Sequence, residues 1–319
     1  MNETYCPNCG HLNRLNARFC AACGRMLVAA EAEAGDELPT MPSAAAGEQP
    51  LENEQTAPVF RRVEWLAGHK SDIGRQRGTN EDSLIALEFV CVNKSMSRNI
   101  GLFVIADGMG GHEGGEIASG MLVRVLARLA AEEWLPRAVV EDKTFDAADW
   151  LADSVQAGNE AIYESSHEAG FEMGTTVVAV LMESDQACIA HVGDSRAYRI
   201  NGAGIEQLTV DHSLVESLVA TNQISREEAR THPQANVIYR TVGDNPHVVV
   251  DLKRITLAPD DFLLLCSDGL SGMITDIMIR EIVMGASSPQ AACDALVEAA
   301  NRAGGEDNCT VILIELKSI

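Results

Sequence analysis

The apolar and polar positions of the chain group into short apolar runs, which predict strands, and longer periodic stretches, which predict helices. The run "NIGLFVIAD", residues 99–107, is apolar up to its final aspartate and is typical of a buried strand. Residues 113–134 carry apolar side chains at three- and four-residue spacing, which predicts an amphipathic helix. A second helix is expected over residues 147–167. A buried strand is thus followed by a pair of helices.

The second half of the chain is richer in predicted strands. Residues 175–182, 186–192 and 196–200 are apolar runs separated by short turns, which predicts an antiparallel meander. A helix is expected over residues 288–304, with Ser288 as N-cap, Pro289 in its first turn and Gly304 as its stop. The remaining expected elements are a charged helix over 211–229 and strands over 247–257, 261–269 and 308–316.

The order of these elements predicts the fold class. Strands follow one another in hairpins and helices enter in pairs, so the regular alternation of a parallel α/β sheet is absent. We therefore expect an α+β fold with mainly antiparallel sheets.

Composition narrows the function without naming it. The chain is 46% hydrophobic and carries a net charge of −23, which argues against a nucleic-acid-binding surface spread over the whole protein. No apolar run reaches the roughly 18 residues that a membrane span needs, and the start "MNETYCPNCG" lacks the pattern of a signal peptide. We expect a cytoplasmic protein with no membrane partner.

Local composition divides the chain into three parts. Residues 1–27 surround two cysteine pairs, and residues 28–60 hold seven acidic residues and no Lys or Arg. Such a segment buries too little apolar surface to offset its ordering entropy, so it predicts a flexible linker. Residues 61–319 have the mixed pattern of a globular domain.

The cysteines of the first part predict a zinc ribbon. They follow the spacing C-x2-C-x10-C-x2-C, and four thiolates close a tetrahedral structural site. So small a unit depends on its metal to fold. Its charge is about +2, from three Arg against Glu3, and we expect it to dock a protein partner rather than nucleic acid. The expected ligands of one Zn²⁺ are Cys6, Cys9, Cys20 and Cys23.

The loop "ADGMGGHEGGEIAS" after residue 105 is the first candidate for chemistry. It fails the G-x-G-x-x-G dinucleotide pattern, because Glu113 stands at the sixth position from Gly108, and it lacks the Gly-Lys-Ser/Thr of a P-loop. What remains is Asp107 at the end of a buried strand, before a glycine turn in which the carbonyl of Gly108 can approach a ligand.

Acidic residues recur at other predicted strand ends. A single one is an ordinary turn residue, but several at one sheet edge repel unless a positive charge lies between them. An all-oxygen set without His or Cys suits Mg²⁺ or Mn²⁺. These residues are Glu81, Asp82, Asp107, Asp194, Asp268 and Asp307.

Two protein nucleophiles are weaker alternatives. Cys266 lacks the arginine six residues later that a cysteine-dependent phosphatase needs, since Gly272 stands there, and is better read as a core residue. Ser195 lacks the second glycine of a G-x-S-x-G elbow.

Seven motifs in order resemble the bacterial form of the metal-dependent serine/threonine protein phosphatases of type 2C. The resemblance runs from about Trp65 to the C-terminus. It implies a four-layer sandwich of two antiparallel sheets flanked by helix pairs, and hydrolysis of phosphoserine and phosphothreonine. The motifs are "RGTNEDS", "DGMGGHEGGEIA", "MGTTVVAVL", "HVGDSRAYR", "LTVDHSLV", "SDGL" and "EDNCTVILI".

The resemblance also implies roles for individual residues. Asp107 would bridge two Mn²⁺ or Mg²⁺ ions, with the Gly108 carbonyl and Glu81 on one of them. Asp268 and Asp307 would hold the other, Asp194 and Asp268 a third and weaker ion, and Asp82 would act through water. Arg77 matches the phosphate-binding arginine, with Arg75 as substitute, and residues 217–244 match a flap beside the site.

One departure leaves the proton donor of the reaction open. Eukaryotic relatives place His directly after Asp-Gly, whereas this chain has Met109 there and His112 three residues later. His112 is a candidate donor, with packing in the turn as its alternative role.

The implied activity is phosphoprotein hydrolysis that reverses a Ser/Thr kinase, with the ribbon as docking module. A catalytically inactive scaffold and a hydrolase of another phosphoester, such as a nuclease, are the alternatives. No acidic residue of the metal pattern is missing, which disfavours the first, and the negative net charge disfavours the second.

Overall fold

A computed structural model describes most of the chain after residue 62 and two short segments before it. The chain divides into two compact units, Met1–Ala57 and Pro58–Ile319. In the first, β1 (Thr4–Tyr5) pairs antiparallel with β2 (Leu12–Asn13). The four predicted zinc ligands and the predicted linker lie outside the described residues. The described ranges are 4–5, 12–13, 63–93, 96–110, 114–140 and 144–318.

The second unit contains two sheets in which every pair of neighbouring strands is antiparallel. One sheet has the order β10-β9-β12-β13-β3, and the other the order β11-β8-β7-β5-β4, with β6 paired to β5. The first consists of β3 (Val63–Asp72), β9 (Arg196–Ile200), β10 (Ile205–Gln207), β12 (Phe262–Cys266) and β13 (Cys309–Ser318). The second consists of β4 (Asp82–Asn93), β5 (Met96–Gly110), β6 (Met173–Thr175), β7 (Val177–Glu183), β8 (Gln186–Val192) and β11 (Asp251–Thr256).

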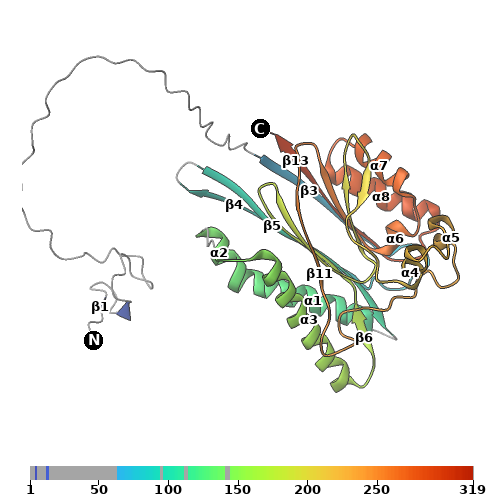
Figure 1. The fold of residues 1–319 in the computed structure, drawn as a ribbon, viewed down its shortest axis with the longest axis horizontal. Coiled ribbons are helices and arrows are strands. Elements are labelled where there is room, and N and C mark those ends of the chain that lie inside the picture. Colours follow the sequence, from blue (N-terminus) through green and yellow to red (C-terminus); the bar gives the residue numbers. More distant parts are fainter. Residues whose placement is uncertain are drawn as a thin grey trace, which may run out of the picture. The chain divides into compact units, whose positions relative to one another are not determined.

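Helices cover the outer face of each sheet (Figure 1). On one side α1 (Gly114–Leu129) continues through a π-helical turn (Ala130–Trp134) into α2 (Leu135–Val139) and packs on α3 (Ala147–Ala169). On the other side lie α6 (Asp268–Ser271), α7 (Asp276–Gly285) and α8 (Pro289–Ala303). No helix among the described residues is long and apolar enough to cross a membrane.

Three buried clusters fill the spaces between these four layers. Leu122 and Leu151 represent the cluster between α1, α3 and the second sheet. Phe103 and Leu265 represent the one between the sheets, and Leu296 the one beneath α7 and α8. The predicted α+β sandwich of antiparallel sheets and helix pairs is therefore confirmed.

Several predicted element ends are also confirmed. Ser288 caps α8, its hydroxyl accepting a hydrogen bond from the Ala291 amide at 3.2 Å. Gly304 ends this helix with a φ of 145°, in the region that favours glycine. The strands expected before Asp107 and before Asp268 are β5 and β12.

The predicted meander is wrong at its third strand. β7 and β8 pair as expected, but β9 pairs with β10 and β12 of the other sheet. The chain crosses between the sheets at residues 193–195, where Gly193 has a φ of 108°. Asp194 thus lies in the turn that passes from one sheet to the other.

Two further expectations need adjustment. The helix expected over 211–229 is split into α4 (Leu214–Ala220) and α5 (Arg226–Arg230), each with a serine N-cap. The strand expected over 247–257 is shorter, because residues 247–250 precede β11 without strand pairing.

Candidate metal centre

The pairing of β4 with β5 brings the first acidic residues together. In the register of this pair Asp82 stands opposite Asp107. The next residue, Gly108, lies close to the backbone of both Gly115 and Glu81. A Cβ added at Gly108 would lie 2.1 Å from the carbonyl oxygen of Gly115 and 2.6 Å from that of Glu81. Only glycine fits there without a shift of the backbone, so the strand end, the Glu81 segment and the start of α1 are held against one another.

Two threonines fix the backbone of Asp107. Its amide donates to the Thr176 hydroxyl at 3.0 Å, and its carbonyl accepts from the Thr175 hydroxyl and the Thr176 amide, both at 2.8 Å. The Thr176 hydroxyl also contacts that of Ser195 at 2.7 Å. The turn that carries Asp194 is thereby tied to the strand that carries Asp107.

Glu81 is held by groups remote in sequence. Its amide donates to Asn308 Oδ1 at 2.8 Å, and its carbonyl accepts from the Ser119 hydroxyl of α1 at 2.6 Å. Asn308 Nδ2 in turn donates to the carbonyls of Ile73 and Thr79, at 2.9 Å each. The Asn308 side chain therefore ties the segment before β4 to the loop that carries Asp307.

Asp268 enters at the end of β12, where α6 begins. Gly269 packs so closely that a Cβ there would lie 2.0 Å from the Asn308 carbonyl oxygen, which places the start of α6 against the Asp307 loop. The preceding Ser267 donates to Asp82 Oδ2 at 2.9 Å and accepts from the Thr310 amide at 3.0 Å. The acids therefore come from strand ends of both sheets, and not from the edge of a single sheet as the sequence predicts.

The convergence disfavours the charged form of these acids. Burial, then repulsion from Asp82 and Asp268, raises the pKa of Asp107 well above its ordinary value. Burial, then the charge of Asp268, has the same effect on the pKa of Asp194. Burial, then repulsion from Asp307, raises the pKa of Asp268, and burial also raises that of Glu81 despite the nearby Arg77. The carboxylates are close enough to repel, as the sequence pattern predicts.

The arrangement fits hard divalent cations. The Oδ1 atoms of Asp82, Asp194 and Asp268 are enclosed and lack a hydrogen-bond partner, so each has a lone pair free for a ligand. Within the described ranges no group of three or more His, Cys, Asp or Glu side chains is arranged to hold one ion by itself. Mg²⁺ is usually held by one or two carboxylates and several waters rather than by a cage of protein ligands. The donor set suits such a water-rich site.

Arg77 lies at the rim of this group. Its Nη2 donates to Asp307 Oδ2 at 2.5 Å, and the charges of Asp307, Glu81 and Asp268 raise its pKa. The Arg77 side chain is 48% exposed, so it faces solvent as well as the carboxylates. Arg75 differs, because its charge helps to lower the pKa of Asp72, after the larger effect of the hydrogen bond from Asn301. Of the two predicted arginines, Arg77 is the one beside the acidic group.

The two alternative nucleophiles are buried. Cys266 is fully enclosed in the core, and burial raises the pKa of its thiol to about 12, which leaves it protonated at neutral pH. Ser195 is 0% exposed and bonded to Thr176. The interpretation of Cys266 as a core residue is confirmed. His112 lies outside the described residues.

The predicted flap, residues 217–244, lies beside the acidic group. A cleft of about 500 Å³ is lined by Asp194, Asp268 and Asp307 together with residues of α4 and α5. The Leu214 amide, just before the flap, donates to the Val237 carbonyl within it at 2.8 Å. The flap thus forms one wall of the approach to the site.

The sequence analysis missed the residues that hold the acids in place. Asn308, Thr176, Ser267 and Ser119 carry no charge, and their bonds reach partners that are distant along the chain. Their sequence signal is position, because Asn308, Thr176 and Ser267 lie within the quoted motifs and Ser119 directly follows one.

Comparison with known proteins agrees with this geometry. The family model described as Protein phosphatase 2C matches residues 86–302, and one described as a zinc-ribbon domain matches residues 5–27. The serine/threonine phosphatase stp of Listeria monocytogenes is 39% identical over 251 residues, which are 78% of this chain and 95% of the relative.

Solved structures give the same result. The catalytic domain of the serine threonine protein phosphatase PstP, in complex with 2 manganese ions, matches with a TM-score of 0.67 and 32% identity, over 80% of this chain and 100% of that domain. Stp1 from Staphylococcus aureus matches with a TM-score of 0.69 and 36% identity, over 79% and 95% of the two chains. The chain belongs to the protein phosphatase 2C family. It is a serine/threonine phosphatase.

Proposed function

We propose that the chain hydrolyses phosphoserine and phosphothreonine in proteins, opposing a Ser/Thr kinase, with Mn²⁺ or Mg²⁺ held by the acidic group. The observation that supports this most is the set of enclosed carboxylate oxygens without partners. Asp107 and Asp268 would hold these ions, and Asp194 would be a further ligand. The remaining proposed ligands are Glu81, the Gly108 carbonyl and Asp307.

The chain's own residues position these groups. When bound, such cations supply a water of lowered pKa and neutralise charge on the phosphoryl oxygens. Thr175 and Thr176 fix Asp107, and Asn308 fixes the backbone of Glu81, so the carboxylates are held in place before substrate arrives. Arg77 offers a planar donor fork to the phosphate, which requires its guanidinium to share or leave Asp307.

For the N-terminal segment we propose a structural Zn²⁺ on Cys6, Cys9, Cys20 and Cys23. The match of residues 5–27 to a zinc-ribbon family supports it. The ribbon would dock the phosphatase on a protein partner, and we propose that the enzyme works in the cytoplasm.

The test is the rate of phosphate release from a phosphothreonine peptide in the presence of Mn²⁺. Asp107→Asn and Asp268→Asn each keep the shape of the side chain and remove its charge. We expect each to lower kcat by about a hundredfold or more, whereas Asp153→Asn, at an exposed position of α3, keeps the rate. Near-normal turnover of either site variant would refute the assignment.

A further inference from the structure

The cleft beside the acidic group extends beyond the proposed metal ligands. Its floor holds Asp194, which is 7% exposed and whose Oδ1 lacks a partner, so the cleft leads to the atoms that a bound ligand must reach. Its walls come from α5 of the flap, the start of α7 and the loop before β13. A phosphorylated side chain that reaches the floor places its neighbouring residues between these walls.

The walls carry carboxylates with no ion-pair partner in the described part of the chain. Glu227 on α5 and Glu306 before β13 are exposed, and neither makes a hydrogen bond or ion pair with its carboxylate. Asp276 at the start of α7 makes a single contact, from the Tyr198 hydroxyl at 3.4 Å. Negative charge therefore faces the cleft from three sides.

The cations of the cleft are mostly committed. Arg196 holds Asp211 through three contacts of 2.6 to 3.0 Å, and Arg226 lies 3.2 Å from Glu216. Arg230 donates to the carbonyls of Gly272 and Ile274, at 3.3 and 3.1 Å, and is the third cation of this lining. Glu227, Asp276 and Glu306 have no ion-pair partner, whereas Arg230 is the one arginine of this lining without a carboxylate partner. The outer cleft therefore carries an excess of negative charge.

We propose that this cleft selects phosphoproteins with Lys or Arg beside the phosphorylated residue. The inference rests on the proposed phosphatase function and adds a substrate class to it. Glu227 and Glu306 are the specificity-determining residues, because they line the cleft from different elements and make no ion pair. Acidic neighbours meet like charges in the cleft, and basic ones meet opposite charges.

The test compares kcat/KM for three peptides that share a central phosphothreonine and differ in the two residues on each side, which are Lys, Gln or Glu. For the native chain we expect the Lys peptide to exceed the Glu peptide roughly tenfold, from exposed pairs of modest strength. The ratio falls as salt is raised, because exposed charges are screened. A change at the metal centre alters kcat/KM for both peptides alike and therefore leaves this ratio unchanged.

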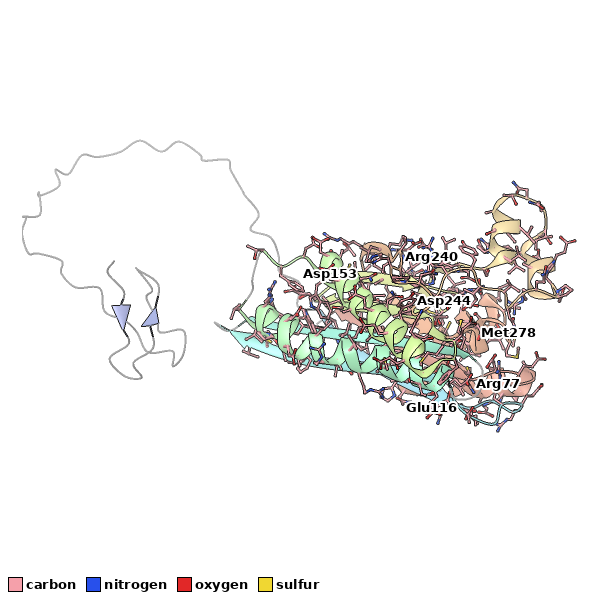
Figure 2. The ribbon with its side chains drawn as sticks, turned by 90° about the horizontal axis from the view of Figure 1, so that it is seen from below. Arg77, Glu116, Asp153, Arg240, Asp244 and Met278 are labelled. Carbon is pink, nitrogen blue, oxygen red and sulfur yellow. The ribbon has the colours of Figure 1, made fainter. Side chains whose placement is uncertain are left out.

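Substitutions of Glu227 and Glu306 test whether the preference for basic peptides comes from the cleft. In E227Q/E306Q the ratio moves toward one, and in E227K/E306K it falls below one. The charge-matched controls E133Q/D153N and E133K/D153K change exposed carboxylates of the helical layer on the second sheet. Figure 2 shows Asp153 well away from Arg77. These controls keep the native ratio.

The outcomes separate this proposal from the phosphatase function itself. Equal rates on the three peptides, or a ratio that the cleft variants do not change, overturn the specificity proposal and leave the phosphatase standing. A native chain that releases no phosphate from any peptide or from para-nitrophenyl phosphate, with Mn²⁺ present, overturns both.

Discussion

At the scale of the residue, the site consists of acids that the fold places where their charge is unfavourable. Burial and mutual repulsion raise the pKa values of Asp107, Asp194 and Asp268. When the pKa of a group is raised in the folded state, its contribution to stability is complete below the pKa of the unfolded state, near 4. This contribution is lost as pH rises through the pKa of the folded state. Asp72 and Asp251 have lowered pKa values, so their contribution is complete above pH 4 and is lost only in acid.

The directions of these pKa shifts predict how the free energy of unfolding changes with pH. In a chelator, the free energy of unfolding of the catalytic unit should fall between about pH 5 and 8, and saturating Mn²⁺ should remove most of this fall. Asp107→Asn should raise metal-free stability at pH 7.5 by about 1–3 kcal/mol. Denaturant unfolding with and without Mn²⁺ measures both effects. A metal-free stability that rises over this range would contradict the raised pKa values of the acidic group.

At the scale of the element, the site depends on how closely β5, α1 and the Glu81 segment approach. Gly108 packs against the Gly115 carbonyl of α1 and the Glu81 carbonyl. Both contacts are to backbone, which a side-chain rotation does not relieve. The position of the metal ligands is thus linked to the packing of whole elements.

Gly108→Ala tests this dependence. The added Cβ forces the elements apart, and we expect a loss of about 2–4 kcal/mol in the free energy of unfolding together with loss of turnover. Gly202→Ala is the matched control, because nothing lies within 4 Å of its Cβ position. Equal stability of the two variants, measured by chemical unfolding, would show that the close approach is unimportant.

The elements also show what the sequence predicts and what it does not. Asp107 and Asp268 were predictable, because each ends an apolar run that forms a strand from local pattern alone. The crossing of β9 into the other sheet was not, since it depends on pairing with β12, which lies more than sixty residues later. Asn308 was missed for the same reason, because its partners Ile73, Thr79 and Glu81 are remote in sequence.

At the scale of the whole molecule, the chain joins a cysteine-containing unit to a catalytic unit. The family match to the phosphatase lies within Pro58–Ile319, and the zinc-ribbon match lies within Met1–Ala57. All of the proposed Mn²⁺ or Mg²⁺ ligands belong to the second unit. The catalytic unit should therefore work without the first.

Removal of residues 1–60 tests this independence. We expect the shortened chain to hydrolyse para-nitrophenyl phosphate at a rate within about twofold of the full chain, because the preorganised site is untouched. Elemental analysis should show that it has lost one bound zinc. A collapse of the rate would show that the N-terminal unit belongs to the catalytic machinery.

Phosphate release by full-length protein, stripped of metal and then titrated with Mn²⁺, measures whether the carboxylates work through bound cations. We predict no turnover of a phosphothreonine peptide before titration and a saturable rise during it. Calorimetry should show at least the two ions seen in the related PstP domain. A rate that is the same before and after Mn²⁺ is added would contradict the claim that the converging carboxylates work through bound cations.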